Sequence, residues 1–401
     1  MKSGYINILT INGGSSSIKF AICEMAEIPN KKLAGQIIRI GLPNTVLNVT
    51  EIASGKKDHV QIDSRDFKES AEFLINWLKE QNYIDQISCV GHRIVLGMEH
   101  TNPEIINDSL LKELYKISEY DPDHLPAEIE IIEIFKREFP LLFQVASYDT
   151  SFHSTMPRVA KIFPIPRRFD QKGIRRYGFH GLSFAYLMGA LKKFNGSDKS
   201  KGKIILAHLG NGASLAAVKD GRSVDTTMGF TPAGGLMMGT RPGDIDPGIA
   251  WYLMQIEQLS ADQFNHLINH ESGLLGVSEI SSDIQDLLEK EDSDIRAAEA
   301  VALFCYQVRK WIGAFVAVLN GLDTLVFSGG IGENAPKIRL RICKEFDYLG
   351  IEIDEDENTK NSTVISKINS KVKVCVIPTD EELMIAKNTG ALYFKAGNIQ
   401  K

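Results

Sequence analysis

Two arginines in glycine-rich surroundings are the residues of this sequence that packing explains least well. Arg93 follows Gly91 and His92 at the end of an apolar segment, and Arg241 follows Gly239 and Thr240. A guanidinium presents a planar fork of N–H donors that matches the oxygens of a carboxylate or a phosphate. The two arginines therefore predict a site for a planar anion.

Four predicted turns rich in Gly, Asn, Ser and Thr could receive phosphate: residues 12–17, 208–214, 229–243 and 328–334. Glycine allows the backbone to approach a ligand and to expose its N–H groups. Neither G-x-x-x-x-G-K-[ST] nor G-x-G-x-x-G is present, which excludes the P-loop and the dinucleotide-binding motif. A single segment of this kind could be an ordinary turn, but four of them favour a split phosphate-binding cleft.

Several single residues have two interpretations. Lys19 is either a solvated lysine or, on an alternating strand, shares a face with Ser15 and Ser17. Asp149 follows an apolar strand, where a catalytic group and a turn or capping residue are about equally expected. His180 lies among glycines and aromatic residues. Considered alone, it is better interpreted as a packed core histidine than as a functional residue. His92, His124, His153 and His208 are similar single histidines, and they do not indicate a zinc site.

The segment from Thr379 to Glu382 predicts the start of a helix. Thr379 with Glu382 three residues later forms a capping box, and Asp380 and Glu381 lie in the first turn, where carboxylates complement the helix dipole. Glu381 then remains available for Mg²⁺, which needs one or two carboxylates besides nucleotide phosphates.

The elements around these residues predict an α/β fold. Short apolar strands alternate with segments of helical periodicity, and residues 5–11 and 17–23 form a strand–turn–strand unit that recurs at 204–209 and 214–218. The Asn-Gly turns of the two units lie about half the chain length apart. This repeat favours two domains related by duplication.

Composition narrows the class of protein. The chain has 401 residues with 45 basic and 51 acidic side chains, a net charge of −6, which argues against a nucleic-acid partner. We expect no membrane span, because no uninterrupted apolar run approaches about 20 residues. The five cysteines have no ligand spacing, and we expect reduced, mostly buried thiols in a cytoplasmic protein.

A set of short motifs follows a specific order along the chain, from residue 12 to residue 382. The motifs are Asn12-Gly13-Gly14-Ser15, Gly91-His92-Arg93, Tyr177-Gly178-Phe179-His180-Gly181, His208-Leu209-Gly210-Asn211-Gly212, Met238-Gly239-Thr240-Arg241, Gly330-Ile331-Gly332-Glu333-Asn334 and Pro378-Thr379-Asp380-Glu381-Glu382. No single motif is decisive, but the ordered set resembles the acetate kinase family.

The resemblance implies an α/β protein of two duplicated actin-like (ribonuclease H-like) domains with a cleft between them. The expected domains are 1–150, completed by a C-terminal helix at about 383–401, and 151–382. The implied activity is reversible, direct in-line transfer of a phosphoryl group from ATP to acetate, giving acetyl phosphate and ADP, with Mg²⁺ or Mn²⁺. A cytoplasmic homodimer without nucleic-acid or membrane partners is expected.

The resemblance also implies a role for each motif residue. Arg93 binds the carboxylate, Arg241 and His180 stabilise the transferred phosphoryl group, and Asp149 orients the reactants or Mg²⁺. Val95, Phe179 and Pro232 form the wall of the acyl pocket, and Asn12 and Glu381 lie near the metal. The expected nucleotide-binding residues are Ser15, Ser17, Lys19, His208, Leu209, Gly210, Asn211, Gly212, Asp283, Ile284, Gln285, Gly330, Ile331, Gly332, Glu333 and Asn334.

The sequence departs from the family pattern near the acyl pocket, at Leu96, Met98 and Asp123, and at Gln285 beside the nucleotide. These departures keep propionate or another short-chain acid open as the substrate. A protein of the same fold that binds ATP without acyl transfer is a second alternative, but it would not need a cage of Arg93, Arg241 and His180.

Overall fold

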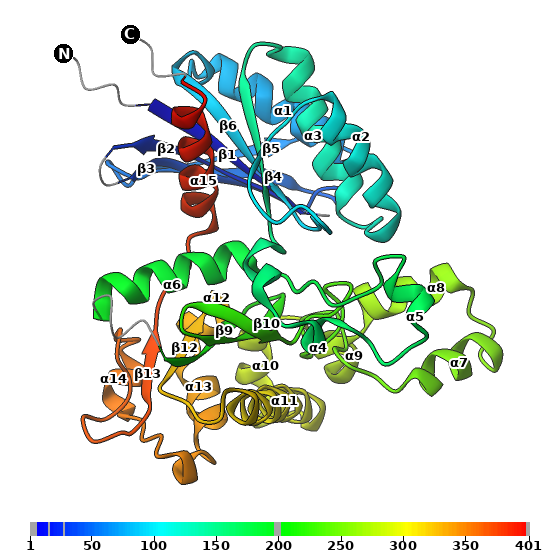
Figure 1. Cartoon of the computed structure of the whole chain (residues 1–401), viewed down its shortest axis with the longest axis vertical. Helices are drawn as coiled ribbons and strands as arrows, with labels where there is room; N and C mark the ends of the chain where they lie inside the picture. The colour runs from blue at the N-terminus through cyan, green and yellow to red at the C-terminus, as the bar shows by residue number, and fades with distance from the viewer. Residues whose placement is uncertain (1–5, 15–16, 27–28, 196–201, 398–401) are drawn as a thin grey trace. The chain divides into compact units, whose positions relative to one another are not determined.

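The computed structural model describes residues 6–14, 17–26, 29–195 and 202–397 (Figure 1). The chain divides into two compact units. Unit one comprises Met1–Ser151 and Asp380–Lys401, and unit two comprises Phe152–Thr379.

Unit one contains a sheet with the strand order β5-β4-β3-β2-β1-β6-β8-β7. Strands β1 to β5 pair antiparallel with their neighbours, β1, β6 and β8 run parallel, and β7 pairs antiparallel with β8. The strands are β1 (Ile6–Gly14), β2 (Ser17–Met25), β3 (Asn30–Ile38), β4 (Thr45–Glu51), β5 (Lys57–Ile62), β6 (Ile87–Ile94), β7 (Glu104–Ile105) and β8 (Phe143–Tyr148).

Helices cover both faces of this sheet, because alternate residues of β1 point to opposite sides. Leu9 packs in one cluster with Leu74 of α1 (Phe67–Glu80) and Phe135 of α3 (Leu125–Glu138). Its neighbour Ile8 packs instead with Ala386 of α15 (Glu381–Lys395), the red helix of Figure 1. A further helix, α2 (Asp108–Ile117), contacts α3.

Unit two contains a second sheet, with the strand order β11-β10-β9-β12-β13. A meander of antiparallel strands followed by two parallel strands repeats the order β3-β2-β1-β6-β8 of unit one. Two mixed sheets of corresponding order confirm the predicted α/β class and the duplication. The strands are β9 (Lys203–Leu209), β10 (Ala213–Lys219), β11 (Arg222–Thr226), β12 (Thr324–Ser328) and β13 (Lys373–Val376).

The core of unit two lies between this sheet and its helices. Phe184 and Leu187 of α6 (Gly181–Asn195) pack against Leu206 and Val326 of the sheet, and α11 (Ile295–Leu319) lies on the other side (Figure 1). The remaining α-helices are α4 (Arg158–Lys161), α5 (Arg167–Asp170), α7 (Pro247–Gln255), α8 (Ala261–His266), α9 (Gly273–Ser278), α10 (Ile284–Lys290), α12 (Gly329–Asn334), α13 (Pro336–Cys343) and α14 (Glu355–Thr359).

Helix α11 is relevant to the expectation that the chain has no membrane span. Its 25 residues make it the one described helix that is long and apolar enough to cross a membrane. Its contacts with β9, β10, α9, α10 and α13 and its buried Val301, Phe304 and Phe315 are also those of a core helix. The length and composition of α11 would allow it to span a membrane, but a core helix can have the same length and composition. They are therefore weak evidence for a membrane span.

Two local predictions were wrong. Residues 330–334 form helix α12 and not a turn: Glu333 Oε1 accepts the N–H of Gly329 at 2.8 Å, which satisfies a donor of the first turn. Thr379 does not cap α15. The cap is Asp380, which accepts the N–H of Leu383 at 2.9 Å, while the Thr379 hydroxyl bonds to Ser183.

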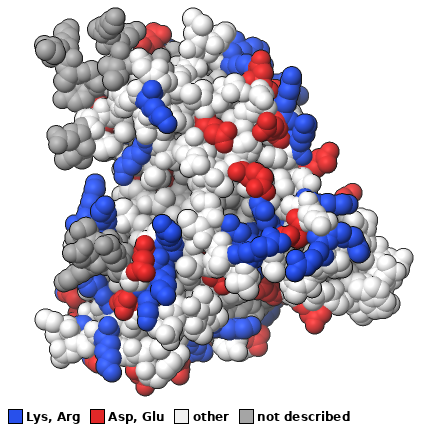
Figure 2. All heavy atoms as spheres, viewed as in Figure 1, with Lys and Arg blue, Asp and Glu red and all other residues white. Residues whose placement is uncertain are grey.

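Basic side chains gather on one part of the surface of unit two. On the face shown in Figure 2, basic side chains gather over the part of unit two that holds α4 and α5, so the net charge of −6 does not describe this surface. The basic residues of this region are Arg158, Lys161, Arg167, Arg168, Lys172, Arg175 and Arg176.

All five cysteines are buried and free, as expected.

Candidate functional site

A buried ion pair lies at the carboxyl ends of two parallel strands of unit one. Arg93 of β6 pairs in register with Ser147 of β8, and the N–H of Asp149 donates to the carbonyl of Ile94 at 2.8 Å. Arg93 Nη2 then donates to Asp149 Oδ2 at 2.8 Å. Burial by itself would lower the pKa of Arg93, but the carboxylates of Asp149 and its neighbours raise it above its ordinary value. The guanidinium is therefore charged and held in place.

A second carboxyl group, Glu128 of α3, adjoins this pair. Its Oε2 accepts the N–H of Val95 at 2.9 Å, and its Oε1 lies 3.7 Å from Arg93 Nη1. The sequence prediction missed Glu128. The signal was present, because Glu128 lies in the apolar stripe formed by Leu125, Ile132 and Phe135, where a charged residue needs a reason.

The predicted metal residues of unit one also meet. Asn12, near the end of β1, donates from Nδ2 to Glu381 Oε2 at 3.0 Å, and Lys19 lies opposite Asn12 on β2. Burial, and then the neighbouring Asp149, raise the pKa of Glu381 to about 7. Glu382 instead faces Lys31, with the two charged atoms 3.6 Å apart. Glu381 is therefore the carboxylate turned toward Asn12.

This arrangement fits a small divalent cation. The Glu381 carboxylate and the Asn12 amide offer oxygen donors. Burial is the main cause of the raised pKa of Glu381 and the nearby Asp149 carboxylate adds to it, so a bound cation would stabilise the ionised form of Glu381. No group of three or more His, Cys, Asp or Glu side chains suited to a metal occurs among the described residues. Mg²⁺ does not need one, since substrate phosphates and water complete its shell.

Two histidines of unit two lie against one another. The rings of His180 and His208 stack with centroids 4.3 Å apart. His180 Nδ1 lies 2.8 Å from Ser214 Oγ, and His208 Nδ1 lies 2.8 Å from Ser183 Oγ. His180 has a φ of +58°, which is uncommon for a residue with a side chain. Both rings are thus oriented from their Nδ1 side.

The predicted acyl-wall residue Phe179 precedes His180 and is 2% exposed. Its carbonyl accepts the Nε2–H of the buried His153 at 3.0 Å. This hydrogen bond fixes the backbone just before His180.

Arg241 lies in the long loop between β11 and α7. Its Nη1 donates to the carbonyl of Pro232 at 3.3 Å, so these two predicted site residues are adjacent. A Cβ at Gly273, whose φ is +64°, would come within 2.8 Å of the Arg241 N and O atoms. The loop therefore packs on α9 in a way that only glycine permits.

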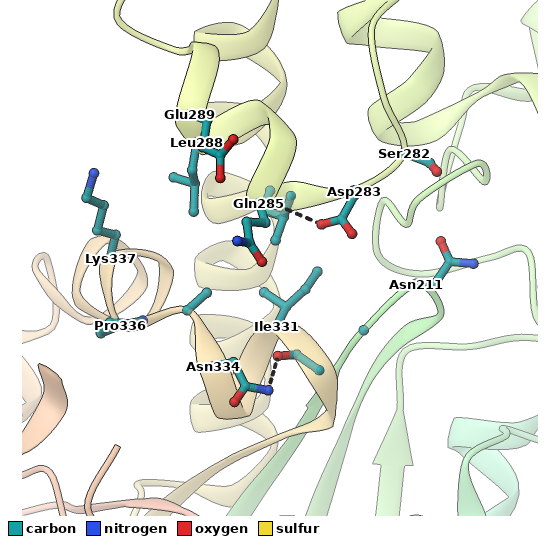
Figure 3. Close-up of a pocket in the computed structure, with 14 residues that line it drawn as sticks. Asn211, Ser282, Asp283, Gln285, Leu288, Glu289, Ile331, Asn334, Pro336 and Lys337 are labelled. Carbon is teal, nitrogen blue, oxygen red and sulfur yellow. Dashed lines mark hydrogen bonds between the residues drawn. The ribbon is translucent and has the colours of Figure 1, made fainter. Parts of the chain in front are cut away.

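A cavity of about 840 Å³ brings together three of the predicted nucleotide segments of unit two (Figure 3). It is lined by Gly210 and Asn211 after β9, by residues 283–285 at the start of α10, and by Gly330, Ile331 and Asn334 of α12. Asp283 caps α10 by accepting the N–H of Gln285 at 2.8 Å. The lining also includes residues that the sequence prediction missed, namely Ser282, Leu288, Glu289, Ala335, Pro336 and Lys337.

Other predicted nucleotide residues do not line this cavity. His208 and Leu209 end β9, Gly212 lies between β9 and β10, and Gly332 and Glu333 belong to α12, but none of the five lines the cavity. Ser17 and Lys19 begin β2 in unit one, and Ser15 lies outside the described residues.

Arg339 of α13, which the sequence prediction also missed, bonds to α12, one of the elements that line the cavity. It is fully buried and donates from Nη1 to the carbonyls of Gly332 at 2.8 Å and Glu333 at 3.0 Å. Its Nη2 donates to the carbonyl of Asn358 at 2.7 Å. These bonds satisfy the last carbonyls of α12 and join it to α14.

Comparison with known proteins adds the family. The acetokinase family model matches residues 7–387. The chain belongs to the acetokinase family. An acetate kinase of Clostridium beijerinckii is 42% identical over 399 residues, which covers 96% of this chain and 99% of that protein.

Two solved structures are also similar to this chain. The crystal structure of Porphyromonas gingivalis acetate kinase has a TM-score of 0.87 at 37% identity, and that of a propionate kinase from Francisella tularensis has a TM-score of 0.90 at 36% identity. Each match covers 96% of this chain and 99% of the other. The acetokinase resemblance inferred from the motifs is therefore confirmed.

Proposed function

We propose that this chain is an ATP:acetate phosphotransferase, which reversibly transfers the γ-phosphoryl group of ATP to acetate and gives acetyl phosphate and ADP. The observation that carries the proposal is the match to acetate kinases over nearly the whole length of both chains. The buried Arg93–Asp149 pair and the cavity of unit two supply chemistry that suits this reaction.

The acceptor side of the reaction is assigned to unit one. Arg93 binds the acceptor carboxylate with its guanidinium fork, Asp149 orients Arg93, and Val95 forms part of the apolar wall. A carboxylate is already ionised at neutral pH, so no general base has to remove a proton. One carboxylate oxygen forms a bond to the γ-phosphorus while the bond from that phosphorus to the β–γ bridging oxygen breaks, and ADP leaves with that oxygen.

The nucleotide side is assigned to unit two. The cavity between residues 210–211, 283–285 and 330–334 takes the nucleoside part of ATP, since its volume suits a ligand of that size. The exposed Lys19 of unit one serves the phosphates together with Ser15, Ser17 and Gly212.

Arg241 and His180 stabilise the phosphoryl group during transfer. In such reactions the protein mainly positions the groups in line and neutralises the charge on the equatorial oxygens. Phe179 and Pro232, which adjoin these two residues in the backbone or by hydrogen bond, complete the acyl wall.

We assign Mg²⁺ to Asn12 and Glu381. When bound with the nucleotide, it would neutralise phosphate oxygens. Glu381 supplies the carboxylate, and the Asp380 cap and the Lys31 ion pair hold the first turn of α15 that carries it.

The proposed setting is a cytoplasmic homodimer that acts on the small molecules acetate and ATP. Family membership and the reduced, buried cysteines support this setting. The units are proposed to be the two duplicated domains.

A second candidate is a kinase for propionate or another short-chain acid. It is favoured by the similarity to a solved propionate kinase and by the unusual Leu96, Met98 and Asp123. Comparing kcat/KM for C2 to C4 acids and hydroxy acids separates the two, since one methylene in an apolar pocket changes the ratio roughly 10- to 200-fold.

The test of the proposal is acyl phosphate formation from ATP and acetate, trapped as the hydroxamate. We expect product with the wild type and loss of most of the rate in Arg241→Ala, with Arg222→Ala, an exposed arginine of β11, as the matched control. Nucleotide binding without acyl phosphate from any acid of the panel would instead indicate an ATP-binding protein of another function.

A further inference from the structure

Glu128 is a buried carboxyl group with one oxygen that no described residue satisfies. Its side chain is 1% exposed, and its Oε1 has no hydrogen-bond partner in the described part of the chain. The same is true of Arg93 Nε, on the guanidinium that Oε1 approaches to 3.7 Å. A buried polar atom of this kind usually marks a place where a water or a ligand binds.

The charges at this place do not balance once an acceptor enters. Arg93 is already paired with Asp149, whose side chain is fully buried. An ionised Glu128 would be a second negative charge against one guanidinium, and an acceptor carboxylate at Arg93 would be a third. Crowding buried negative charges in this way is costly, and a buried group in that position is normally neutralised by a proton.

We propose that Glu128 is a positioning residue of the acceptor site, which joins Arg93 to the Val95 N–H and takes up a proton from solvent so that an acceptor carboxylate can bind. The protonated Oε1 can donate a hydrogen bond, whereas Oε2 continues to accept from Val95. This inference rests on the proposed function, because it assumes that the acceptor binds at Arg93.

The electrostatic surroundings of Glu128 agree with this role. Burial is the main cause that raises the pKa of Glu128 to about 8, and Arg93 on β6 opposes it. The other charged groups that act on Glu128 are Asp121 before α3 and Asp149 after β8, and both raise this pKa. Around neutral pH the Glu128 carboxyl therefore holds its proton, and it loses that proton as the pH rises through about 8.

The acceptor KM of the wild type and of Glu128→Gln, measured at saturating ATP between pH 6.5 and 9, tests the inference. Acetate is ionised throughout this range, so the wild-type KM should rise roughly tenfold from pH 7 to pH 9 as Glu128 ionises. Glutamine resembles the protonated form, because its amide oxygen can accept from the Val95 N–H and its amide N–H can donate to the acceptor carboxylate at Arg93. The variant should match the wild-type KM at pH 7 and lack the rise at pH 9.

The matched control is Glu133→Gln, an exposed glutamate of the same helix, which should behave as the wild type. A wild-type KM that does not change with pH, or a Glu128→Gln variant that keeps the wild-type rise, would overturn the inference. Changes in kcat alone would also overturn it, because a group that prepares the acceptor site acts on acceptor KM.

A stability measurement tests the proton on Glu128 without using activity. The pKa of Glu128 is about 8 in the folded chain, above its ordinary value of 4.5. The folded chain therefore binds this proton more tightly than the unfolded chain does. The unfolding equilibrium constant of the wild type relative to Glu128→Gln should rise roughly tenfold per pH unit between pH 5 and 8 and then level off. A constant ratio would show that Glu128 is not protonated.

The two experiments also separate this inference from the proposed function. If the wild type makes no acyl phosphate, the proposed function fails and the acceptor role of Glu128 fails with it. If acyl phosphate forms but both pH dependences are absent, only the role of Glu128 is refuted.

Discussion

At the residue scale, the proposed role of Arg93 in binding the acceptor depends on the orientation of its guanidinium group as much as on its charge. Its Nη2 donates to Asp149 at 2.8 Å while Nη1 faces Glu128, so the fork is fixed by carboxylates on two elements. The strand end allowed Arg93 and Asp149 to be predicted from the sequence. Glu128 was missed because helical periodicity assigns its position to the core, and only the fold shows which charged group lies opposite.

Arg93→Lys tests the importance of the fork. Lysine keeps the positive charge but cannot hold Asp149 and an acceptor carboxylate at once. We expect the acceptor KM to rise roughly 10- to 100-fold, since a hydrogen bond to a charged group contributes about 1.5–3 kcal/mol. The hydroxamate assay gives this KM, and the KM for ATP should not change.

Arg65→Lys is the matched control for that substitution, because the Arg65 side chain is 86% exposed and pairs with Glu69 on the surface. It should leave both KM values unaltered. An Arg93→Lys enzyme with the wild-type acceptor KM would mean that the acceptor binds elsewhere.

At the element scale, the short helices carry the differences between prediction and structure. Glycine-rich residues 329–334 were expected to form a turn, because the sequence does not show that the side chain of Glu333 returns to bond the N–H of Gly329. For the same reason, Thr379 was expected to cap α15. Its hydroxyl contacts Ser183, far away in the sequence, and Asp380 takes the cap. The strands predicted for the two repeated units, whose periodicity is local, were found as β1, β2, β9 and β10.

Asp380→Ala tests whether the start of α15 positions Glu381. Loss of the cap should cost about 1 kcal/mol of stability, and loss of the ion pair with Lys31 adds to this. We expect the Mg²⁺ concentration for half-maximal activity to rise roughly tenfold or more, as for other groups that orient a metal ligand.

Asp66→Ala provides a control with the same chemistry, since Asp66 caps α1 by accepting the N–H of Glu69 at 2.8 Å. It should lower the urea midpoint comparably and leave the Mg²⁺ requirement unchanged. Equal Mg²⁺ requirements in the two variants would argue against a role of α15 in metal binding.

Arg339→Lys tests the link between α12 and α14. Lysine cannot replace all the donors, so buried carbonyls of Gly332, Glu333 and Asn358 lose partners, at a cost of roughly 2 kcal/mol or more. We expect a lower urea midpoint and a higher KM for ATP, because α12 lines the cavity.

Arg341→Lys on the same helix is the matched control. It weakens an ion pair between the exposed Arg341 and Glu291 and should change stability by less than about 1 kcal/mol. A normal KM for ATP in Arg339→Lys would mean that Arg339 stabilises the fold without shaping the cavity.

At the scale of the whole molecule, the duplicated sheet explains why related turns perform different tasks. The end of β1 carries Asn12, and the turn after β9 carries Gly210 and Asn211, which line the cavity. The repeat could be seen in the sequence because both segments kept an Asn-Gly pair. Their separate tasks could not be predicted from the sequence. Each task depends on which helix begins beside the segment, and this helix is α15 in unit one and α10 in unit two.

Hydrogen exchange of the full chain tests the assignment of the nucleotide to unit two. A ligand that binds only the folded state stabilises it, by about 2.7 kcal/mol at 100 times its Kd. Amides of β9, α10 and α12 around the cavity should therefore exchange more slowly with ADP and Mg²⁺ than with Mg²⁺ alone. The outer strands β3, β4 and β5 of unit one contribute nothing to that cavity and should serve as the internal reference. Protection that is as large in these strands as around the cavity, or absent from α10 and α12, would place the nucleotide elsewhere.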